Sequence, residues 1–336
     1  MGIISYVTEN TIVINDRSSG SVLFFTRDGR PKSRFNHYGR GPREYTQAIM
    51  LRIVYDELAD DVFLFFSGWG APPGPILVYS STGEYKRSLV LPRGVSPFTP
   101  VDFDAHSLFF YDERNQYEKM LNTEIHRSPG SFHSDYYHIS KADGTVLDSL
   151  EIPNNKMDLT FRESGSNSMA KVMRVGKYAS GLYLCHAETD TVFLYDGTLR
   201  PVICKTPLVS DLEPETYMSD FVDLGRYQFV QTSTQYDWLK VPREEWLEYE
   251  KYYVHDTHTG EIFRQKISLP EYKDKVLRIS SYHTYYNGKE TVLVFSLNMV
   301  ELKDAYDAGR LSGKLKALVG RLDEDVDNIY LFARLK

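Results

Sequence analysis

The chain has 336 residues, of which 42% are hydrophobic and 25% charged, a composition typical of a globular protein that buries its own core. Its formal net charge of -7 argues against a nucleic acid as the partner, because binding to a phosphate backbone requires a stripe of basic residues. No apolar run approaches the roughly 20 residues that span a bilayer, so we expect no transmembrane segment.

The N-terminal sequence and the cysteines are uninformative about the cellular compartment. "MGIISYVTEN" has neither a basic region nor a long apolar run, so we expect no signal peptide within this sequence. The two cysteines, Cys185 and Cys204, are too few for a disulfide framework or a cysteine zinc site. We expect both to be free thiols.

Short apolar segments alternate with turn signals along the whole chain. These segments are rich in aromatic and β-branched residues, which favour strands. One hairpin pattern recurs about every 40 to 60 residues, a period typical of propeller blades: an aromatic strand, an Asp-Gly or Thr-Gly turn, then a more polar strand. The copies are "SVLFFTRDGRPKSRF", "ILVYSSTGEYKRSL", "YYHISKADGTVLDSL", "TVFLYDGTLRPVI" and "YYVHDTHTGEIFRQKI". The repeat predicts an all-β fold, a six-bladed β-propeller of four-stranded antiparallel blades.

The whole chain, 1–336, is predicted to be one domain. In chain order, the predicted blades are at about 3–36, 47–91, 99–152, 169–206, 217–269 and 276–336. We expect helical insertions in blade 5, over 235–251, and in blade 6, over 298–328. In the second insertion, one apolar face is predicted to contain Leu311, Leu315, Leu318 and Leu322. A fourth strand for blade 6 would normally come from the N-terminus; since almost nothing precedes blade 1 here, we expect incomplete closure or a contribution from residues upstream.

A corner between blades 1 and 2 is more specific than the blades themselves. In "RDGRPKSRFNHYGRGPREYTQA", an Asp-Gly turn and a strand lead into Gly39, Gly41, Pro42, Glu44 and Tyr45. This pattern resembles the first blade of NHL-type or TolB-like six-bladed propellers of Bacteroidetes, most of which have no established activity. The resemblance implies export to the periplasm or the cell surface, often as a lipoprotein.

The corner residues have expected local roles. Gly39 and Gly41 would allow turns with positive φ, and Pro42 would fix the backbone after them. Glu44 and either Arg40 or Arg43 would tie the crossing by hydrogen bonds, and Tyr45 would anchor it between blades. We expect the corner to lie near the central channel, so these residues are also candidates for ligand contact.

The long loops are predicted to gather on one face of the propeller. With strands A to D ordered outward from the axis, the tight hairpins are C–D turns on one face, while B–C loops and D–A crossings lie on the other. The long segments, which contain all three tryptophans, fall on this second face. Trp69 and Trp238 are therefore candidate ligand contacts. For Trp238 and Trp246, an alternative is an amphipathic helix that packs on the propeller without a ligand.

Charged residues on the predicted inner strands suggest a polar channel. Arg52, Arg174 and Arg278 would alternate with Asp102 and Asp220 around the axis. One interpretation is a ring of structural ion pairs; the other is a site for a polar small molecule, because arginine recognises carboxylates. Asp102 and Asp220 are also weak candidates for a calcium site at the channel mouth.

The sequence contains no recognisable catalytic motif. It has no Gly-x-Ser-x-Gly elbow, and "GRGPRE" has a proline where a phosphate loop needs a backbone donor. We therefore expect a non-catalytic binding or protein-interaction module that uses the loop-rich face, with no cofactor and with a small molecule, glycan or protein as ligand. The alternatives are a calcium-dependent hydrolase or lyase and a structural scaffold in a cell-envelope assembly.

Overall fold

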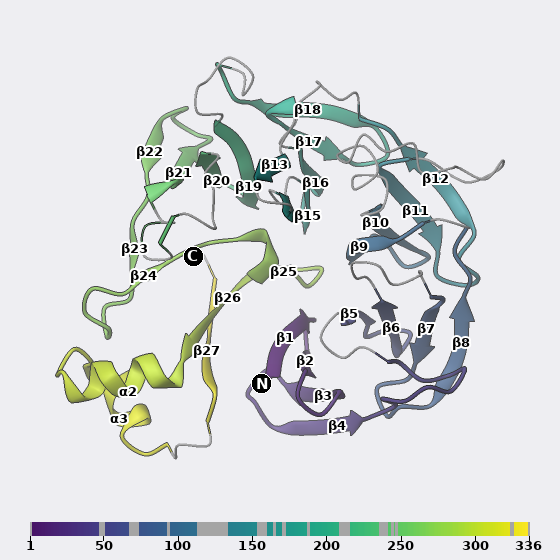
Figure 1. Ribbon diagram of the computed structural model, residues 1–336, viewed down its shortest axis with the longest axis horizontal. Helices are drawn as coiled ribbons and strands as arrows, with labels where there is room; N and C mark the ends of the chain where they lie inside the picture. The colour runs from purple at the N-terminus through teal and green to yellow at the C-terminus, as the bar shows by residue number, and fades with distance from the viewer. Residues whose placement is uncertain are drawn as a thin grey trace.

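The computed structural model describes residues 2–46, 51–66, 74–92, 95–112, 134–152, 160–163, 166–169, 173–186, 189–207, 216–234, 241–242, 245, 248–322 and 326–334. Six antiparallel sheets stand around a common axis, with the first strand of each on the inside (Figure 1). The chain is a six-bladed β-propeller, as the repeat predicts. Five blades have four strands and the sixth has three.

Blades 1 to 3 follow a simple outward order of consecutive strands. Blade 1 contains β1 (Gly2–Val7), β2 (Thr11–Asp16), β3 (Ser21–Thr26) and β4 (Pro31–Phe35). Blade 2 contains β5 (Leu51–Asp56), β6 (Asp61–Phe66), β7 (Ile76–Tyr79) and β8 (Tyr85–Leu89). Blade 3 contains β9 (Pro97–Asp102), β10 (Ser107–Asp112), β11 (Tyr136–Ser140) and β12 (Val146–Leu150).

Blades 4 to 6 continue the ring, with short extra strands between them. Blade 4 contains β15 (Met173–Tyr178), β16 (Gly181–His186), β17 (Thr191–Tyr195) and β18 (Leu199–Cys204). Blade 5 contains β19 (Thr216–Leu224), β20 (Tyr227–Thr234), β21 (Glu250–Asp256) and β22 (Ile262–Arg264). Blade 6 contains β25 (Thr284–Tyr286), β26 (Thr291–Asn298) and β27 (Asn328–Ala333). The pairs β13 (Thr160–Glu163) with β14 (Ser166–Met169), and β23 (Ile267–Ser268) with β24 (Val276–Leu277), lie between blades in sequence.

The five recurring hairpins are the C–D turns of blades 1 to 5, as predicted. Each contains one glycine with a left-handed backbone, at φ between 75° and 106°. These glycines are Gly29, Gly83, Gly144, Gly197 and Gly260. Because a side chain at such a φ meets its own backbone, glycine at these positions allows the tight return.

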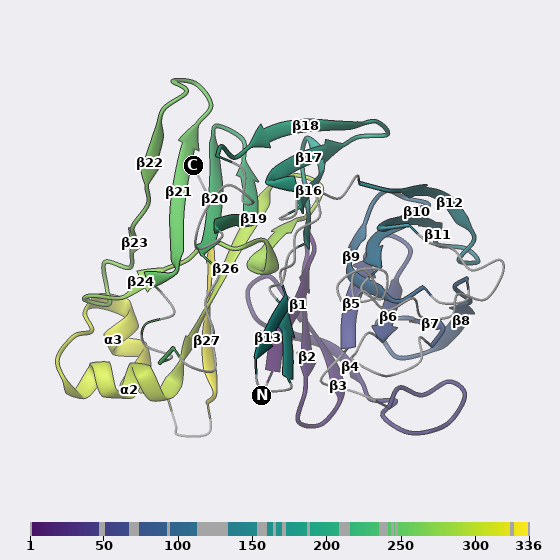
Figure 2. The ribbon, with the colours of Figure 1, turned by 45° about the horizontal axis from the view of Figure 1, so that its top comes forward.

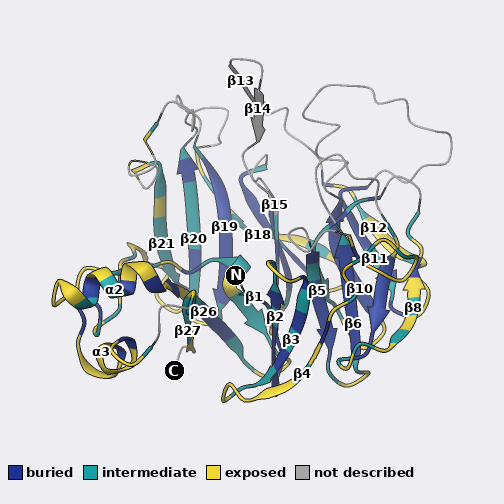
Figure 3. Cartoon of the chain, turned by 60° about the horizontal axis from the view of Figure 1, so that its bottom comes forward, coloured by how far each residue is buried: buried dark blue, intermediate teal, exposed yellow. Residues whose placement is uncertain are grey.

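Alternation along the inner strands of each blade builds the core between blades. In β5, Leu51, Ile53 and Tyr55 pack against blade 1, whereas Val54 packs against blade 3. Burial is therefore greatest in the middle strands, and the outer strands β4 and β8 are largely exposed on alternate residues (Figure 3). Large aromatic side chains fill the wedge-shaped gaps between sheets that fan out from one axis.

Blade 6 meets blade 1 and closes the ring without a fourth strand in the described residues. The hydroxyl of Tyr330, in β27, donates to the carbonyl of Gly2, and the hydroxyl of Tyr285 donates to the carbonyl of Ile4 at 3.0 Å. Val292 and Val294 of β26 pack against the apolar side of β1 and β2. Side-chain packing, and not strand pairing, therefore joins the two ends of the described chain.

The predicted insertion in blade 6 contains two helices, α2 (Met299–Asp307) and α3 (Gly313–Val319), at the outer side of the blade (Figure 2). Asn298 caps α2 by accepting from the amides of Val300 and Glu301. Leu311 and Leu315 are buried, as predicted, but Leu318 is 38% exposed and Val319 is buried in its place. The difference arises because α3 begins only at Gly313, so its apolar face follows Leu315 and Val319, four residues apart.

Most of the predicted insertion in blade 5 lies outside the described residues. Among the helices in the described part of the chain, none is both long and apolar enough to cross a membrane.

Candidate functional site

A cavity of about 380 Å³ lies on the propeller axis. It is lined by the inner strands β1, β5, β9, β15 and β25, and by the 3-10 helix η4 (Ser281–His283) that precedes β25. Each inner strand begins after a D–A crossing and ends at an A–B turn, so residues at the start of these strands lie towards the loop-rich face. The cavity is the central channel of the propeller.

Three arginines line the loop-rich end of this channel. Arg52 and Arg174 are the second residues of β5 and β15, and Arg17 begins the B–C turn that follows β2. Burial lowers the pKa of Arg17, and the nearby guanidinium of Arg52 lowers it further. The channel therefore has a cationic end in a protein whose net charge is -7.

The contacts of these arginines are mostly with aromatic rings. The guanidinium of Arg174 lies 3.7 Å from the ring centroid of Tyr282, and its Nε donates to the carbonyl of Ser219 at 3.3 Å. The guanidinium of Arg52 lies 5.6 Å from the ring centroid of Phe98. Such stacking holds a guanidinium plane in place and leaves its edge open to hydrogen-bond acceptors.

Three buried polar atoms of the channel wall have no hydrogen-bond partner among the described residues. They are Nε of Arg17, Nη1 of Arg174 and the hydroxyl oxygen of Thr99. A buried donor without a partner costs free energy, and each such group in a native protein requires an explanation.

Thr99 also has an unusual backbone. Its φ is +45°, and the register of β9 with β10 shifts at this point, so that Thr99 and Pro100 form a β-bulge. A positive φ is uncommon for a β-branched residue, and such conformations concentrate at functional sites. The bulge places Thr99 in the channel wall.

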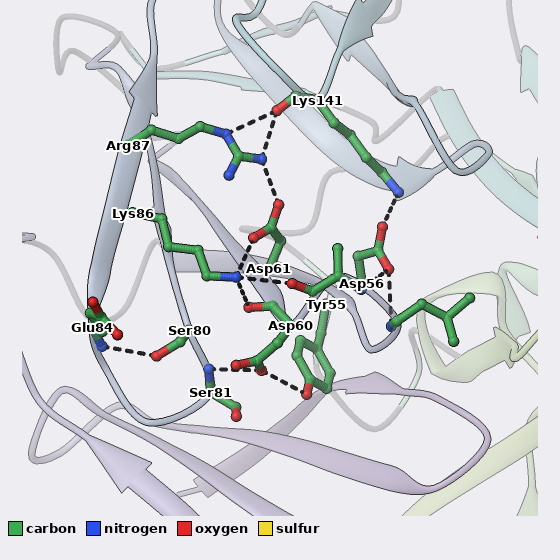
Figure 4. Close-up of polar contacts among 12 residues, drawn as sticks. Tyr55, Asp56, Asp60, Asp61, Ser80, Ser81, Glu84, Lys86, Arg87 and Lys141 are labelled. Atoms are coloured by element: carbon green, nitrogen blue, oxygen red, sulfur yellow. Dashed lines mark hydrogen bonds and ion pairs between the residues drawn. The ribbon is translucent and has the colours of Figure 1, made fainter.

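Two acidic groups, Asp56 and Asp102, lie at the other end of the inner strands, where they share one ammonium. Lys141 is buried, and its ammonium lies 2.6 Å from Oδ2 of Asp56 and 2.7 Å from Oδ1 of Asp102. Burial raises the pKa of Asp102, although Lys141 opposes this shift. In the same region, Arg87 donates to the carbonyl of Lys141 and to Asp61 (Figure 4).

Lys177 and Tyr6 line the channel near these acids. Burial lowers the pKa of Lys177, and Asp102 opposes the shift. Burial raises the pKa of Tyr6 well above its usual value. Among the described residues that line the cavity, the charged side chains are Arg17, Arg52, Arg174 and Lys177, and none is an aspartate or glutamate.

Asp220, a weak calcium candidate, is engaged by neighbouring donors. Its carboxylate accepts from the hydroxyls of Ser280 and Ser281, at 2.7 and 2.5 Å, and from the amide of Ser281 at 3.0 Å. These bonds attach β19 to the segment that leads into blade 6. Asp102, the other weak calcium candidate, faces the ammonium of Lys141. Within the described residues, no three histidine, cysteine, aspartate or glutamate side chains gather as a metal site would require.

The predicted ring of alternating charges is wrong in one position and in its pairing. Arg278 lies away from the channel, 3.3 Å from Glu250 and over the ring of Tyr252 in blade 5. It misses the channel because it follows β24, which lies between blades 5 and 6 and is not an inner strand. Asp102 pairs with Lys141 and Asp220 with serines, so neither aspartate neutralises Arg52 or Arg174.

In the corner at 36–46, Glu44 forms a hydrogen bond as predicted, but with a backbone amide, and the glycines do not have the predicted geometry. Oε2 of Glu44 accepts from the amide of Gly41 at 2.6 Å, and neither Gly39 nor Gly41 has a positive φ. A Cβ atom at Gly39 would overlap with the Glu44 carboxylate, and one at Gly41 would lie 3.0 Å from it. Glycine is required here for the close approach of a side chain.

The corner lies against blade 2 and not beside the channel. Tyr45 is buried between blades 1 and 2, and its hydroxyl donates to the carbonyl of Gly20 at 2.5 Å. Arg43 stacks over Tyr85 of β8, the outermost strand, and Arg40 and Glu44 are exposed. None of these four residues lines the channel cavity. The prediction that the corner lies near the axis is therefore wrong for the described residues.

Trp69, Trp238 and Trp246 lie outside the described residues. Among the residues predicted for the site, the structure brings Arg52 and Arg174 together at one cavity. Sequence reasoning missed Arg17, Thr99 and Lys177, which also line it. The position of Arg17, directly after a B strand, could have identified it, whereas the bulge at Thr99 has no local sequence signal beyond Pro100.

Comparison with known proteins agrees with this fold. Residues 2–158 match the model of a family, DUF5128, described as a 6-bladed beta-propeller. A solved structure from Bacteroides fragilis NCTC 9343, of a protein that its name assigns to export, has a TM-score of 0.62 at 14% identity, covering 100% of this chain and 90% of that chain. A solved structure of a member of the duf4221 family from Bacteroides vulgatus ATCC 8482 has a TM-score of 0.51 at 9% identity, covering 99% of this chain and 92% of that chain. No curated protein matches the chain. At these identities the likeness shows the fold alone.

Proposed function

We propose that this protein is a non-catalytic binding module whose ligand occupies the central channel and enters from the face of the B–C turns and D–A crossings. The observation that carries the proposal is one cavity whose wall contains Arg17, Arg52 and Arg174, together with buried donors on Arg17, Arg174 and Thr99 that have no partner among the described residues. A folded protein retains such groups when a ligand satisfies them, because leaving them empty costs stability.

The dimensions of the channel support a small ligand. A cavity of about 380 Å³ is within the range of small-molecule sites. Tyr282, Tyr285 and Tyr286 contribute aromatic surface to the wall, and polar groups of fixed position lie among them. This combination of apolar surface and a few directed donors is typical of ligand pockets.

A variant in which a large side chain fills the channel tests the proposal. Ser5 lines the channel at a β-bulge of β1, and Ser5→Trp would fill the cavity. Leu58, fully exposed in an A–B turn, gives the matched control Leu58→Trp. We expect compounds from a library of sugars, amino acids, organic acids and nucleosides to raise the Tm of the wild type and of Leu58→Trp, but not that of Ser5→Trp. Equal binding to Ser5→Trp would place the ligand elsewhere.

An extracellular or periplasmic location is part of the proposal, as is kinship with NHL-type or TolB-like propellers of Bacteroidetes. The name of the similar Bacteroides fragilis structure and the pattern of the corner at 36–46 support both. Fractionation of the native host should find the protein in the envelope or periplasm. Its recovery in the cytosol alone would contradict this location.

A further inference from the structure

The charged groups around the channel are unevenly distributed between its two ends. Arg17, Arg52 and Arg174 lie at the loop-rich end. At the opposite end, Asp56 and Asp102 end β5 and β9 and lie beside the cations Lys141 and Lys177, so that this end mixes both signs of charge. We propose that the ligand carries an oxyanion, a carboxylate, phosphate or sulfate, which binds at the loop-rich end between these three arginines. This inference rests on the proposed function and names the chemistry of its ligand.

The first step is that the arginines lack acidic partners among the described residues. Arg17 and Arg52 are close enough to repel each other, and neither forms an ion pair there. Like-charged groups held together at the wall of a cavity are stabilised when an anion lies between them.

The second step is that the nearby acids are already occupied. Asp56 and Asp102 share the ammonium of Lys141. Asp220 is held by Ser280 and Ser281, and Asp104 accepts from Ser107 at 2.6 Å and from the amide of His106 at 2.8 Å. Burial lowers the pKa of the channel-lining His283, which favours the neutral imidazole. Among the described residues, none of these carboxylates forms an ion pair with the three arginines, although Asp220 lies near Arg174, whose Nε donates to the adjacent carbonyl of Ser219.

The third step is geometric. Stacking on Tyr282 and the bond to Ser219 fix the plane of Arg174, while its Nη1 has no partner among the described residues. Nε of Arg17 and the hydroxyl of Thr99 are likewise unsatisfied. Guanidinium edges with a nearby hydroxyl match the in-plane lone pairs of a carboxylate and the oxygens of phosphate or sulfate.

The experiment measures saturable stabilisation by defined anions. The Tm of the full chain is recorded against acetate, succinate, citrate, phosphate and sulfate, with sodium chloride used to keep the ionic strength constant. We expect at least one of these oxyanions to raise the Tm saturably, and the apparent Kd to rise at least tenfold in Arg52→Gln and in Arg174→Gln. Arg52→Lys, which keeps the charge but loses the fork, should give an intermediate value. The exposed Arg30 in a C–D turn supplies the control Arg30→Gln, which should bind like the wild type.

The outcomes test two claims separately: that the ligand is an oxyanion, and that it binds in the channel. Preference for the carboxylates, for phosphate or for sulfate identifies the anion. No saturable effect of any oxyanion, or equal binding by Arg52→Gln and the wild type, would overturn the inference. A neutral compound that binds the wild type and Arg52→Gln alike but not Ser5→Trp would overturn it while leaving the proposed function intact. Oxyanion binding that persists in Ser5→Trp would instead contradict the channel as the site.

Discussion

At Gly39 and Gly41, the side chain of Glu44 folds back over the backbone of its own corner. The carboxylate accepts from the Gly41 amide, and a Cβ atom at Gly39 would overlap with it. The sequence predicts a turn at this corner, because glycine next to proline indicates one. The sequence does not predict why the glycines are needed, because the close approach of the Glu44 carboxylate to Gly39 and Gly41 depends on the three-dimensional orientation of that side chain.

Gly39→Ala should destabilise the protein by about 1 to 3 kcal/mol, because the new methyl group must displace the Glu44 carboxylate from its hydrogen bond. Urea unfolding measures the effect. Gly74→Ala is the matched control, since no described residue lies within 4 Å of a Cβ atom there. Equal stability of the two variants would show that the corner adjusts freely.

Asp256 gives a pH-dependent prediction. Two bonds from Arg226, Nη2 at 2.6 Å and Nε at 3.1 Å, hold the pKa of Asp256 down to about 2. A depressed carboxyl pKa contributes stability that is present above the unfolded value, about 3.9, and is lost as the pH falls through the folded value. The difference in urea midpoint between the wild type and Asp256→Asn should thus be constant above about pH 5 and shrink between pH 4 and 2. A difference that stays constant down to pH 2 would contradict this assignment.

Among the elements, the strands that the sequence predicts best are those with a repeated local signal. The C–D hairpins were predictable because each requires a left-handed glycine between an aromatic and a polar strand. Bulges were not predictable, since the shifts in β1, β9 and β19 depend on how the inner strands meet around the axis. The bulge in β9 is the one that places Thr99 in the channel wall.

Lys141 joins two inner strands, and its removal should be costly. Lys141→Met would leave Asp56 and Asp102 both near the same buried space without their shared cation. Breaking a buried ion pair by removing one partner costs about 3 to 5 kcal/mol, which urea unfolding can measure.

Two further variants set limits on the loss of stability expected for Lys141→Met. Adding Asp102→Asn to Lys141→Met should recover part of the loss, because one uncompensated charge is removed. Lys86→Met, which breaks a more exposed pair with Asp61, should cost no more than about 1 kcal/mol. A loss no larger in Lys141→Met than in Lys86→Met would show that the buried network contributes little.

At the scale of the whole molecule, the channel concentrates positive charge on the axis of an acidic protein. Arg17→Gln should raise the free energy of unfolding by about 0.5 to 2 kcal/mol in chloride buffer, because it removes a repulsive neighbour of Arg52 and a buried unsatisfied donor. Arg278→Gln should instead lower stability slightly, since Arg278 pairs with Glu250. A clear loss of stability in Arg17→Gln would show that this arginine supports the fold and not a ligand.

The sequence by itself determined the all-β class, the six blades, their tight C–D turns and the helices of blade 6, because these follow from periodicity and turn chemistry within about 50 residues. It also identified Arg52 and Arg174 as residues near the axis. Only the tertiary structure decided which charges meet. Arg278 pairs with Glu250 outside the channel, and Lys141, in the C–D turn of blade 3, pairs with Asp56 and Asp102. Arg17, in a B–C turn, lines the channel. Such partners lie tens of residues apart in sequence, and their meeting depends on how the blades pack around the axis, which no local pattern records.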